Sequence, residues 1–186
     1  MARTPLTALI FDMDGVLLES EGLWRQAEGE VSLSLGLNFT DDDFRSTMGV
    51  RMREVAQIWF GWQPWTGPST DEVAQRVVDR VVELVSTQPL LAGVHETIEL
   101  ARRRGMKLGL CTSSDTPLVD AVLGSLHLGG VFDVVHSAEN DAFGKPHPMP
   151  YLITAELLGV QPEACVVIED SVTGAVSAKA AKMKVI

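Results

Sequence analysis

The 186-residue chain is 46% hydrophobic and 22% charged, which is ordinary for a globular protein that can bury a sizeable core. Its formal net charge of −10 argues against nucleic-acid binding, which needs a basic surface, and no apolar run is long enough to span a membrane. Cys111 and Cys165 are the only cysteines, and both fall in apolar runs, as expected of buried thiols rather than of a disulfide framework. Since the sequence shows no signal-peptide pattern, we expect a cytoplasmic protein.

Taken in chain order, short apolar runs alternate with helical patterns, apart from one long stretch that is helical throughout. The predicted strands are residues 8–11, 107–111, 131–135, 165–168 and 183–186. Helical patterns at residues 94–104, 118–126 and 150–158 separate them. This alternation predicts an α/β fold with a doubly wound parallel sheet, in which ligands bind at the carboxyl ends of the strands.

Residues 20 to about 88 contain helical patterns only, at 21–35, 41–47, 52–60 and 71–85. Ser69 and Glu72 have the spacing of a capping box. Thr40 precedes three aspartates, so we interpret residues 41–43 as a helix start rather than a metal site. We therefore expect an all-helical cap at residues 19–88, inserted into a catalytic core that is formed by residues 1–18 and 89–186.

Polar motifs follow the predicted strands. Asp12 and Asp14 come directly after the first strand. Two ionised carboxylates there repel each other and lose hydration, so they need a positive partner such as a divalent metal, or a transferred group that one of them attacks. The later motifs are Thr112-Ser113-Ser114, Gly144-Lys145-Pro146-His147-Pro148 and Glu169-Asp170.

Each motif taken alone has a simpler interpretation. Thr112 could merely cap the helix that begins near Asp115, and Lys145 could be a solvated loop residue. Glu169 and Asp170 could be acids at a helix start. Because the motifs occur together at strand ends, we favour one common site.

The four motifs, in this order and with a helical insert after the first, resemble the haloacid dehalogenase superfamily over essentially the whole chain. An aspartate carboxylate can attack phosphorus, so Asp12 is the candidate nucleophile, and Asp14 is the candidate general acid and base. The resemblance implies a Mg²⁺ ion held by Asp12, the backbone carbonyl of Asp14 and the side chain of Asp170. Glu169 would orient a metal-bound water.

The same resemblance implies a phosphate site. The Thr112 hydroxyl and the Ser113 amide, close to a helix start, suit an anion. The Lys145 ammonium can hold both the phosphate and the Asp12 carboxylate. We expect His147 to order its loop rather than to act as a base.

Further segments narrow the resemblance to the bacterial hexitol phosphatases, also called 2-deoxyglucose-6-phosphate phosphatases. They are residues 11–15, Ser20-Glu21, Trp24, residues 63–69 and residues 89–94. This resemblance implies a Mg²⁺-dependent phosphatase for small phosphorylated sugars or sugar alcohols. Glu21, Trp24 and Arg51 are then the candidate specificity residues of the cap, although Trp24 could equally pack between cap and core.

Two features depart from the family pattern. Glu19 stands where relatives usually have aspartate, and the chain ends at Ile186 where relatives continue, so we expect a truncated C-terminus. Two other functions stay open. One is a phosphosugar mutase of the β-phosphoglucomutase type, although such enzymes carry a histidine where Trp24 stands. The other is a catalytically impaired fragment. We expect a monomer that binds neither nucleic acid nor a membrane.

Overall fold

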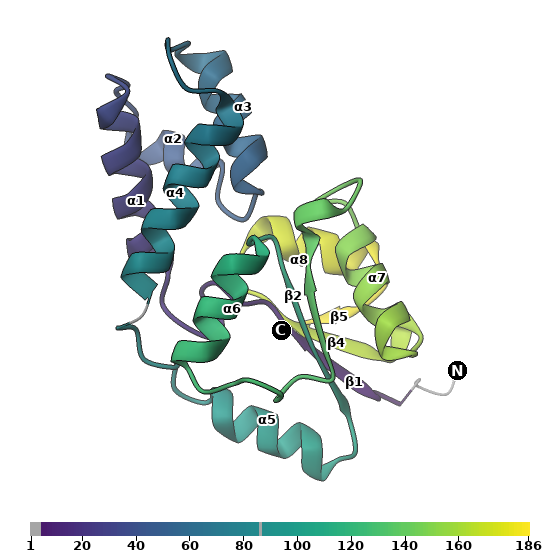
Figure 1. Cartoon of the computed structure of the whole chain (residues 1–186). Helices are drawn as coiled ribbons and strands as arrows, with labels where there is room; N and C mark the ends of the chain where they lie inside the picture. The colour runs from purple at the N-terminus through teal and green to yellow at the C-terminus, as the bar shows by residue number, and fades with distance from the viewer. Residues whose placement is uncertain (1–4, 86) are drawn as a thin grey trace.

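The protein is an α/β fold built on a parallel sheet with strand order β3-β2-β1-β4-β5 (Figure 1), and the computed structural model describes residues 5–85 and 87–186. All neighbouring strands run parallel. The strands are β1 Ala8–Phe11, β2 Lys107–Thr112, β3 Val134–Ser137, β4 Cys165–Ile168 and β5 Lys184–Val185. The predicted doubly wound parallel sheet is confirmed.

Alternating side chains of β1 face two helical layers, because successive residues of a strand point to opposite faces. Leu9 and Phe11 belong to the hydrophobic cluster that includes α5 (Val94–Arg103) and α6 (Thr116–Ser125). Ala8 and Ile10 belong to the cluster that includes α7 (Met149–Leu158) and α8 (Val172–Ala180). Short 3₁₀ helices at Ala138–Asn140 and Pro162–Ala164 precede α7 and β4. The carboxyl ends of the strands remain open for a site.

Four helices between β1 and α5 form a separate group beside the sheet, at the upper left of Figure 1. They are α1 Glu21–Ser34, α2 Asp41–Ser46, α3 Met52–Trp62 and α4 Thr70–Val85. Both predicted helix starts are confirmed. Thr40 and Asp43 form a reciprocal capping box, and the Ser69 hydroxyl accepts a hydrogen bond from the Glu72 amide while the Glu72 carboxylate accepts one from the Ser69 amide. We call residues 19–88 the helical insert.

The third strand lies further along the chain than the sequence predicts. It comprises Val134–Ser137, whereas the apolar run suggested residues 131–135. Phe132 instead packs its ring edge-on against Phe11, with 5.8 Å between the ring centroids. The Asp133 carboxylate accepts a hydrogen bond from the Leu108 amide at 2.7 Å. The first residues of the run therefore serve the core rather than the sheet.

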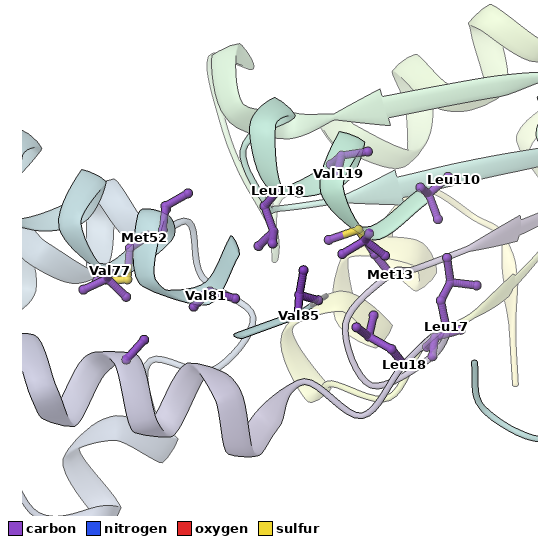
Figure 2. Close-up of a cluster of buried hydrophobic side chains, with 14 of the residues drawn as sticks. Met13, Leu17, Leu18, Met52, Val77, Val81, Val85, Leu110, Leu118 and Val119 are labelled. Atoms are coloured by element: carbon purple, nitrogen blue, oxygen red, sulfur yellow. The ribbon is translucent and has the colours of Figure 1, made fainter. Parts of the chain in front are cut away.

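Helix α4 links the helical insert to the rest of the fold through buried apolar side chains. Val77, Val81 and Val85 of α4 continue the cluster that contains Leu118 of α6 and Met13 of the loop after β1 (Figure 2). All of these side chains are almost fully buried. The insert thus shares one hydrophobic core with the face of the sheet that α5 and α6 cover.

Both cysteines are buried and unpaired, as predicted. Burial raises the pKa of the Cys111 thiol to about 12 and that of the Cys165 thiol to about 11, so neither is a reactive thiolate at neutral pH. Within residues 5–85 and 87–186, no helix has both the length and the apolar character needed to cross a membrane.

Candidate active site

A cavity of about 380 Å³ lies where the carboxyl ends of the strands face the helical insert. Eight of the residues singled out by sequence as a site line it together. They are Asp12, Asp14, Thr112, Ser113, Lys145, Asp170, Glu21 and Trp24. Glu19 lines it as well, whereas Glu169 and Arg51 are not part of its wall. The strand-end motifs therefore converge on one place.

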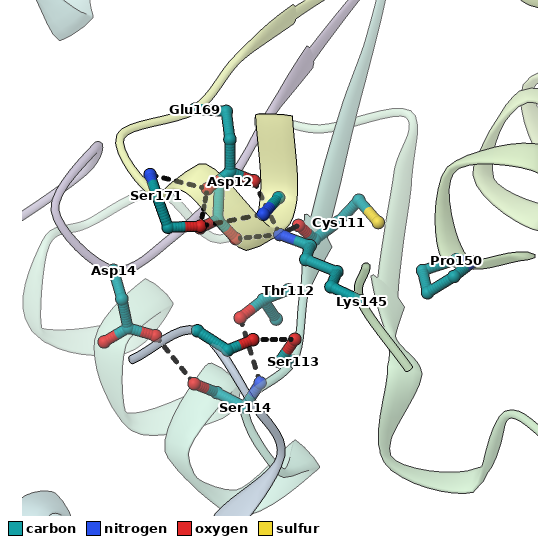
Figure 3. Close-up of polar contacts among 12 residues, drawn as sticks. Asp12, Asp14, Cys111, Thr112, Ser113, Ser114, Lys145, Pro150, Glu169 and Ser171 are labelled. Carbon is teal, nitrogen blue, oxygen red and sulfur yellow. Dashed lines mark hydrogen bonds and ion pairs between the residues drawn. The ribbon is translucent and has the colours of Figure 1, made fainter. Parts of the chain in front are cut away.

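Asp12 and Lys145 form a buried ion pair at the bottom of this cavity. The Asp12 amide donates to the carbonyl of Ile168 at 2.9 Å, which fixes the residue at the tip of β1 beside β4. The Lys145 ammonium lies 2.9 Å from Asp12 Oδ1 and 2.8 Å from Glu169 Oε2 (Figure 3). Asp12 is only 7% exposed and Lys145 3%. One ammonium thus serves two carboxylates.

The surroundings shift the pKa values of this group strongly. Burial raises the pKa of Asp12 well above its ordinary value despite the nearby Lys145, and the carboxylates of Glu169 and Asp14 raise it further. Burial alone would lower the pKa of Lys145, but Asp12, Tyr151 and Glu169 raise it well above its ordinary value. The lysine therefore keeps its charge, and the excess of carboxylates favours a second cation close by.

Glu169 is held by protein donors on both of its oxygens. Oε2 accepts from Lys145 and from the Tyr151 hydroxyl at 2.5 Å, and Oε1 accepts from the Ser171 hydroxyl at 2.8 Å. Although burial alone would raise it, these partners, Lys145 foremost, lower the pKa of Glu169. Gly174 leaves room for this carboxylate, because a side chain there would collide with it. Glu169 is therefore a rigid anion beneath the cavity wall.

The carboxylate of Asp14 accepts one hydrogen bond on each oxygen. The Trp24 indole N–H donates to Oδ1 at 2.8 Å, and the Ser114 hydroxyl donates to Oδ2 at 2.6 Å. Trp24 belongs to the insert and Ser114 to the loop after β2, so both halves of the fold hold this one side chain. Sequence reasoning missed Ser114. Its only signal was its place as the third residue of the Thr112-Ser113-Ser114 motif.

Three carboxylates offer a place for a metal ion. Oxygen atoms of Asp12, Glu169 and Asp170 all lie within 4.8 Å of one another. Burial, followed by the charge of Glu169, raises the pKa of Asp170, which indicates repulsion that a cation would relieve. Gly15, with φ of +69°, lets the chain turn directly against the Asp170 carboxylate, where any side chain would collide. Carboxylate oxygens are the donors that Mg²⁺ prefers, so the residues fit that ion.

The loop after β2 is ordered by its own hydroxyl groups. Thr112 is 1% exposed, and its hydroxyl accepts a hydrogen bond from the Ser114 amide at 3.0 Å. The Ser113 hydroxyl donates to the carbonyl of Gly49 in the insert at 3.2 Å. Helix α6 begins one residue after Asp115, whose side chain makes no capping bond. Thr112 therefore orders the loop at the cavity and does not cap α6.

Arg51 lies where the helical insert touches the core. Its guanidinium pairs with Glu54 and donates to the carbonyls of Ala138 at 3.2 Å and Asp141 at 2.7 Å. These bonds direct the side chain toward the loop between β3 and α7. Of the three expected specificity residues, Glu21 and Trp24 thus reach the cavity, while Arg51 fastens the insert.

Comparison with known proteins agrees with this geometry. A family model described as haloacid dehalogenase-like hydrolase matches residues 6–182. The chain belongs to the haloacid dehalogenase-like hydrolases. The chain is 43% identical to hexitol phosphatase B of Escherichia coli over 181 residues, which are 96% of this chain and 82% of that protein. Over 182 residues it is 38% identical to a phosphorylated carbohydrates phosphatase of Thermotoga maritima, covering 95% of this chain and 82% of the relative.

Among solved structures, a β-phosphoglucomutase from Clostridium difficile superimposes with a TM-score of 0.85 at 26% identity, covering 97% of this chain and 83% of that one. The haloacid dehalogenase-like hydrolase described here is thus an enzyme of the phosphatase type, and it has mutase relatives of the same fold.

Proposed function

We propose that this hydrolase is a Mg²⁺-dependent phosphomonoesterase that acts on small phosphorylated sugars or sugar alcohols through an aspartyl-phosphate. One observation carries the proposal. A buried aspartate, paired with a lysine at 2.9 Å, shares a cavity with a second aspartate whose two oxygens each accept a hydrogen bond. The first carboxylate suits attack on phosphorus, and the second suits proton transfer.

In the first half of the reaction, a carboxylate oxygen of Asp12 attacks the phosphorus atom of the ester. The bond between phosphorus and the sugar oxygen breaks, and Asp14 gives its proton to that oxygen, so the alcohol leaves neutral. Lys145, already beside Asp12, stabilises the negative charge of the phosphoryl group during transfer. The Thr112 hydroxyl and the Ser113 amide hold the phosphoryl oxygens.

In the second half, a water molecule attacks the phosphorus of the aspartyl-phosphate. Asp14 accepts a proton from that water, and the bond between phosphorus and Asp12 breaks to release inorganic phosphate. The hydrogen bonds from Trp24 and Ser114 would hold the Asp14 carboxylate in place for both proton transfers. The same carboxyl thus acts in both halves, and the enzyme returns to its starting protonation state.

Asp12, Asp170 and the backbone carbonyl of Asp14 would hold Mg²⁺, and Glu169 would orient its water ligands. When bound, the ion neutralises charge on the phosphate and on the neighbouring carboxylates. The hydrogen bonds of Glu169 favour this division of roles, because both of its carboxylate oxygens already accept hydrogen bonds from the protein.

We further propose that residues 19–88 act as a cap that excludes water and contacts the leaving group. The cavity wall supports this role, since α1 and α2 supply one side of it and the strand ends the other.

Replacement of Asp12 tests the covalent step. Asp12→Asn should reduce kcat by at least about 10³-fold, because an amide is a poor nucleophile.

The assay is phosphate release from a panel of hexose and hexitol phosphates and from p-nitrophenyl phosphate, with Mg²⁺ and with EDTA. Activity should disappear in EDTA and return on adding Mg²⁺. Circular dichroism of Asp12→Asn controls for folding. Full activity of this variant would exclude the aspartyl-phosphate, and a flat profile over the panel would exclude the sugar assignment.

A phosphosugar mutase is the second candidate, because the β-phosphoglucomutase from Clostridium difficile shares the fold. Incubation with β-glucose 1-phosphate separates the two functions. A mutase would form glucose 6-phosphate without net phosphate release, whereas the phosphatase proposed here releases inorganic phosphate.

A further inference from the structure

The inner face of helix α1 is a continuous part of the cavity wall. Glu21, Trp24, Arg25 and Glu28 all line the cavity. Their spacing of three, four and seven residues from Glu21 places them on one side of the helix. Trp24 contacts Asp14, and Glu28 lies one helical turn, about 6 Å, further along α1. The face therefore runs from the reacting end of the cavity to its other end.

Two of these side chains already have partners. Trp24 donates to Asp14, as described above. Arg25 pairs with Asp41 and stacks over the ring of Phe44, 3.7 Å from its centroid. These contacts leave Arg25 engaged with the insert itself.

Unlike Trp24 and Arg25, Glu28 makes no hydrogen bond and no ion pair with residues 5–85 and 87–186. Glu21 also lacks a side-chain partner among these residues, but it is exposed, whereas Glu28 is partly buried. Phe44, Met52 and Val55 add apolar surface to the insert side of the same cavity and are themselves buried in the core of the insert, while Arg25 and Arg45 also line it. A partly buried carboxyl group in such a place loses part of its hydration without gaining a protein partner, which costs stability.

The protonation of Glu28 fits a neutral ligand. Burial raises its pKa to about 8, although the charge of Arg25 works against the shift. At neutral pH the group is therefore mostly the neutral acid, which donates through its O–H and accepts through its C=O. Hydroxyl groups complement both atoms and bring no charge into the apolar wall.

We propose that Glu28 is a specificity-determining residue, which hydrogen-bonds hydroxyl groups of a polyhydroxylated leaving group while its phosphate occupies the site at Asp12. This inference rests on the proposed phosphatase function and narrows it to neutral polyol esters. The one-turn separation from Trp24 lets Glu28 reach hydroxyls of a hexitol that are remote from the ester oxygen. The hydroxyl groups of the ligand supply the hydrogen-bonding partner that Glu28 lacks within the protein.

The test compares the wild type with Glu28→Leu, Glu28→Gln and Glu30→Gln. Glu30 is on the same helix, but pairs with Arg80 away from the cavity, which makes it the matched control. The readout is the ratio of kcat/KM for a hexitol phosphate to that for p-nitrophenyl phosphate, whose leaving group lacks hydroxyls. Glu28→Leu should lower this ratio at least about tenfold, because a site that recognises hydroxyls loses its partner.

Glu28→Gln keeps a donor and an acceptor, so its ratio should stay within about threefold of the wild type. Glu30→Gln should match the wild type. Glu28→Ala serves as a second variant should Glu28→Leu fail to fold, and it should lower the ratio in the same way.

The possible results distinguish the proposed substrate class from the proposed role of Glu28. A wild-type enzyme that cleaves p-nitrophenyl phosphate but no hexitol phosphate would overturn the proposed substrate class, and this inference with it. A wild type active on hexitol phosphates, with an unchanged ratio in Glu28→Leu and Glu28→Ala, would overturn only the role of Glu28. Equal losses on both substrates would show a structural role and overturn it too.

Discussion

We call the side of the cavity formed by the strand ends, with Asp12 and Lys145, its floor, and the side formed by the inner face of α1, with Trp24 and Glu28, its roof. The two sides differ in whether their charged groups have partners within the protein. At the floor, the Lys145 ammonium lies 2.8–2.9 Å from the carboxylates of Asp12 and Glu169, which share this one protein cation. At the roof, Glu28 lines the cavity with no bonded partner among the described residues, beside an arginine that is engaged elsewhere. The ion pairs of the floor are formed within the protein, whereas our proposal assigns the partner of Glu28 to the ligand.

In the functions proposed above, the floor carries out the chemical steps and the roof selects the leaving group. A preorganised floor can stabilise charge without rearranging during the reaction. A roof whose Glu28 carboxyl has no protein partner can discriminate among leaving groups, because a leaving group without suitable hydroxyls leaves this partly buried carboxyl unpaired. Trp24 is the exception, since it belongs to the roof but donates to Asp14 at the floor.

Removing the shared ammonium should cause the largest change. Lys145→Met leaves Asp12 and Glu169 facing each other without a cation, and breaking such a buried pair costs about 3–5 kcal/mol. We expect a corresponding drop in the free energy of unfolding, measured by urea denaturation, and loss of turnover by at least about 10³-fold.

Lys179→Met is the matched control, because Lys179 is exposed near the end of α8 and should change stability by less than about 0.5 kcal/mol. Adding Asp12→Asn to Lys145→Met should restore part of the lost stability, since one unpaired charge disappears. A stable and active Lys145→Met would show that the floor is not preorganised by this ion pair.

Removing the hydrogen bond between Trp24 and Asp14 should lower kcat less than removing Lys145 does. Trp24→Phe keeps an aromatic ring, although a smaller one, but loses the N–H that donates to Asp14, a hydrogen bond to a charged group worth about 1.5–3 kcal/mol. We expect kcat to fall about tenfold to a hundredfold with KM changed less, and the pH profile of kcat to shift.

Trp62→Phe, at an exposed tryptophan in the same insert, is the control and should match the wild type. If Trp24→Phe raised KM alone and left the pH profile untouched, Trp24 would be a substrate platform rather than a positioning residue for Asp14.

A further prediction concerns the pH dependence of stability at the roof. The folded-state pKa of Glu28 is raised to about 8, above its unfolded value of about 4.3, so the folded state binds more protons between these values. The free energy of unfolding should therefore fall as pH rises through this window. Glu28→Gln removes this contribution, so its stability relative to the wild type should increase from about pH 5 to about pH 8.

Urea denaturation of both proteins at the two pH values measures the difference. Asp170 and Asp115, whose pKa values are also raised, are present in both proteins and cancel in the comparison. Parallel pH dependences would mean that the Glu28 carboxyl is solvated, which would remove the distinction between roof and floor.

Sequence predicted the floor far better than the roof. Strand-end motifs identify Asp12, Thr112, Lys145 and Asp170, because parallel strands bring their carboxyl ends to one edge of the sheet. Roof contacts depend on how the helices turn relative to the core. Glu28 carried no sequence signal beyond its helical spacing from Trp24, and Arg51 took its partners from a loop about ninety residues away in the chain.

Strand β3 was misplaced by sequence for a related reason. Val131 and Phe132 look like the start of a strand, but the packing of Phe132 on Phe11 decides their conformation. Local patterns cannot report a contact between residues so far apart in sequence. The same limit hid Ser114, whose importance comes from a hydrogen bond to Asp14 across the cavity.

The buried valines of α4 have a consequence for how the protein unfolds. Val81 and Val85 belong to the same apolar cluster as Leu118 of the core (Figure 2), so neither the insert nor the sheet layers can melt without exposing apolar surface of the other. We expect one cooperative transition, with the same midpoint whether it is followed by tryptophan fluorescence, which reports on the insert, or by far-UV circular dichroism.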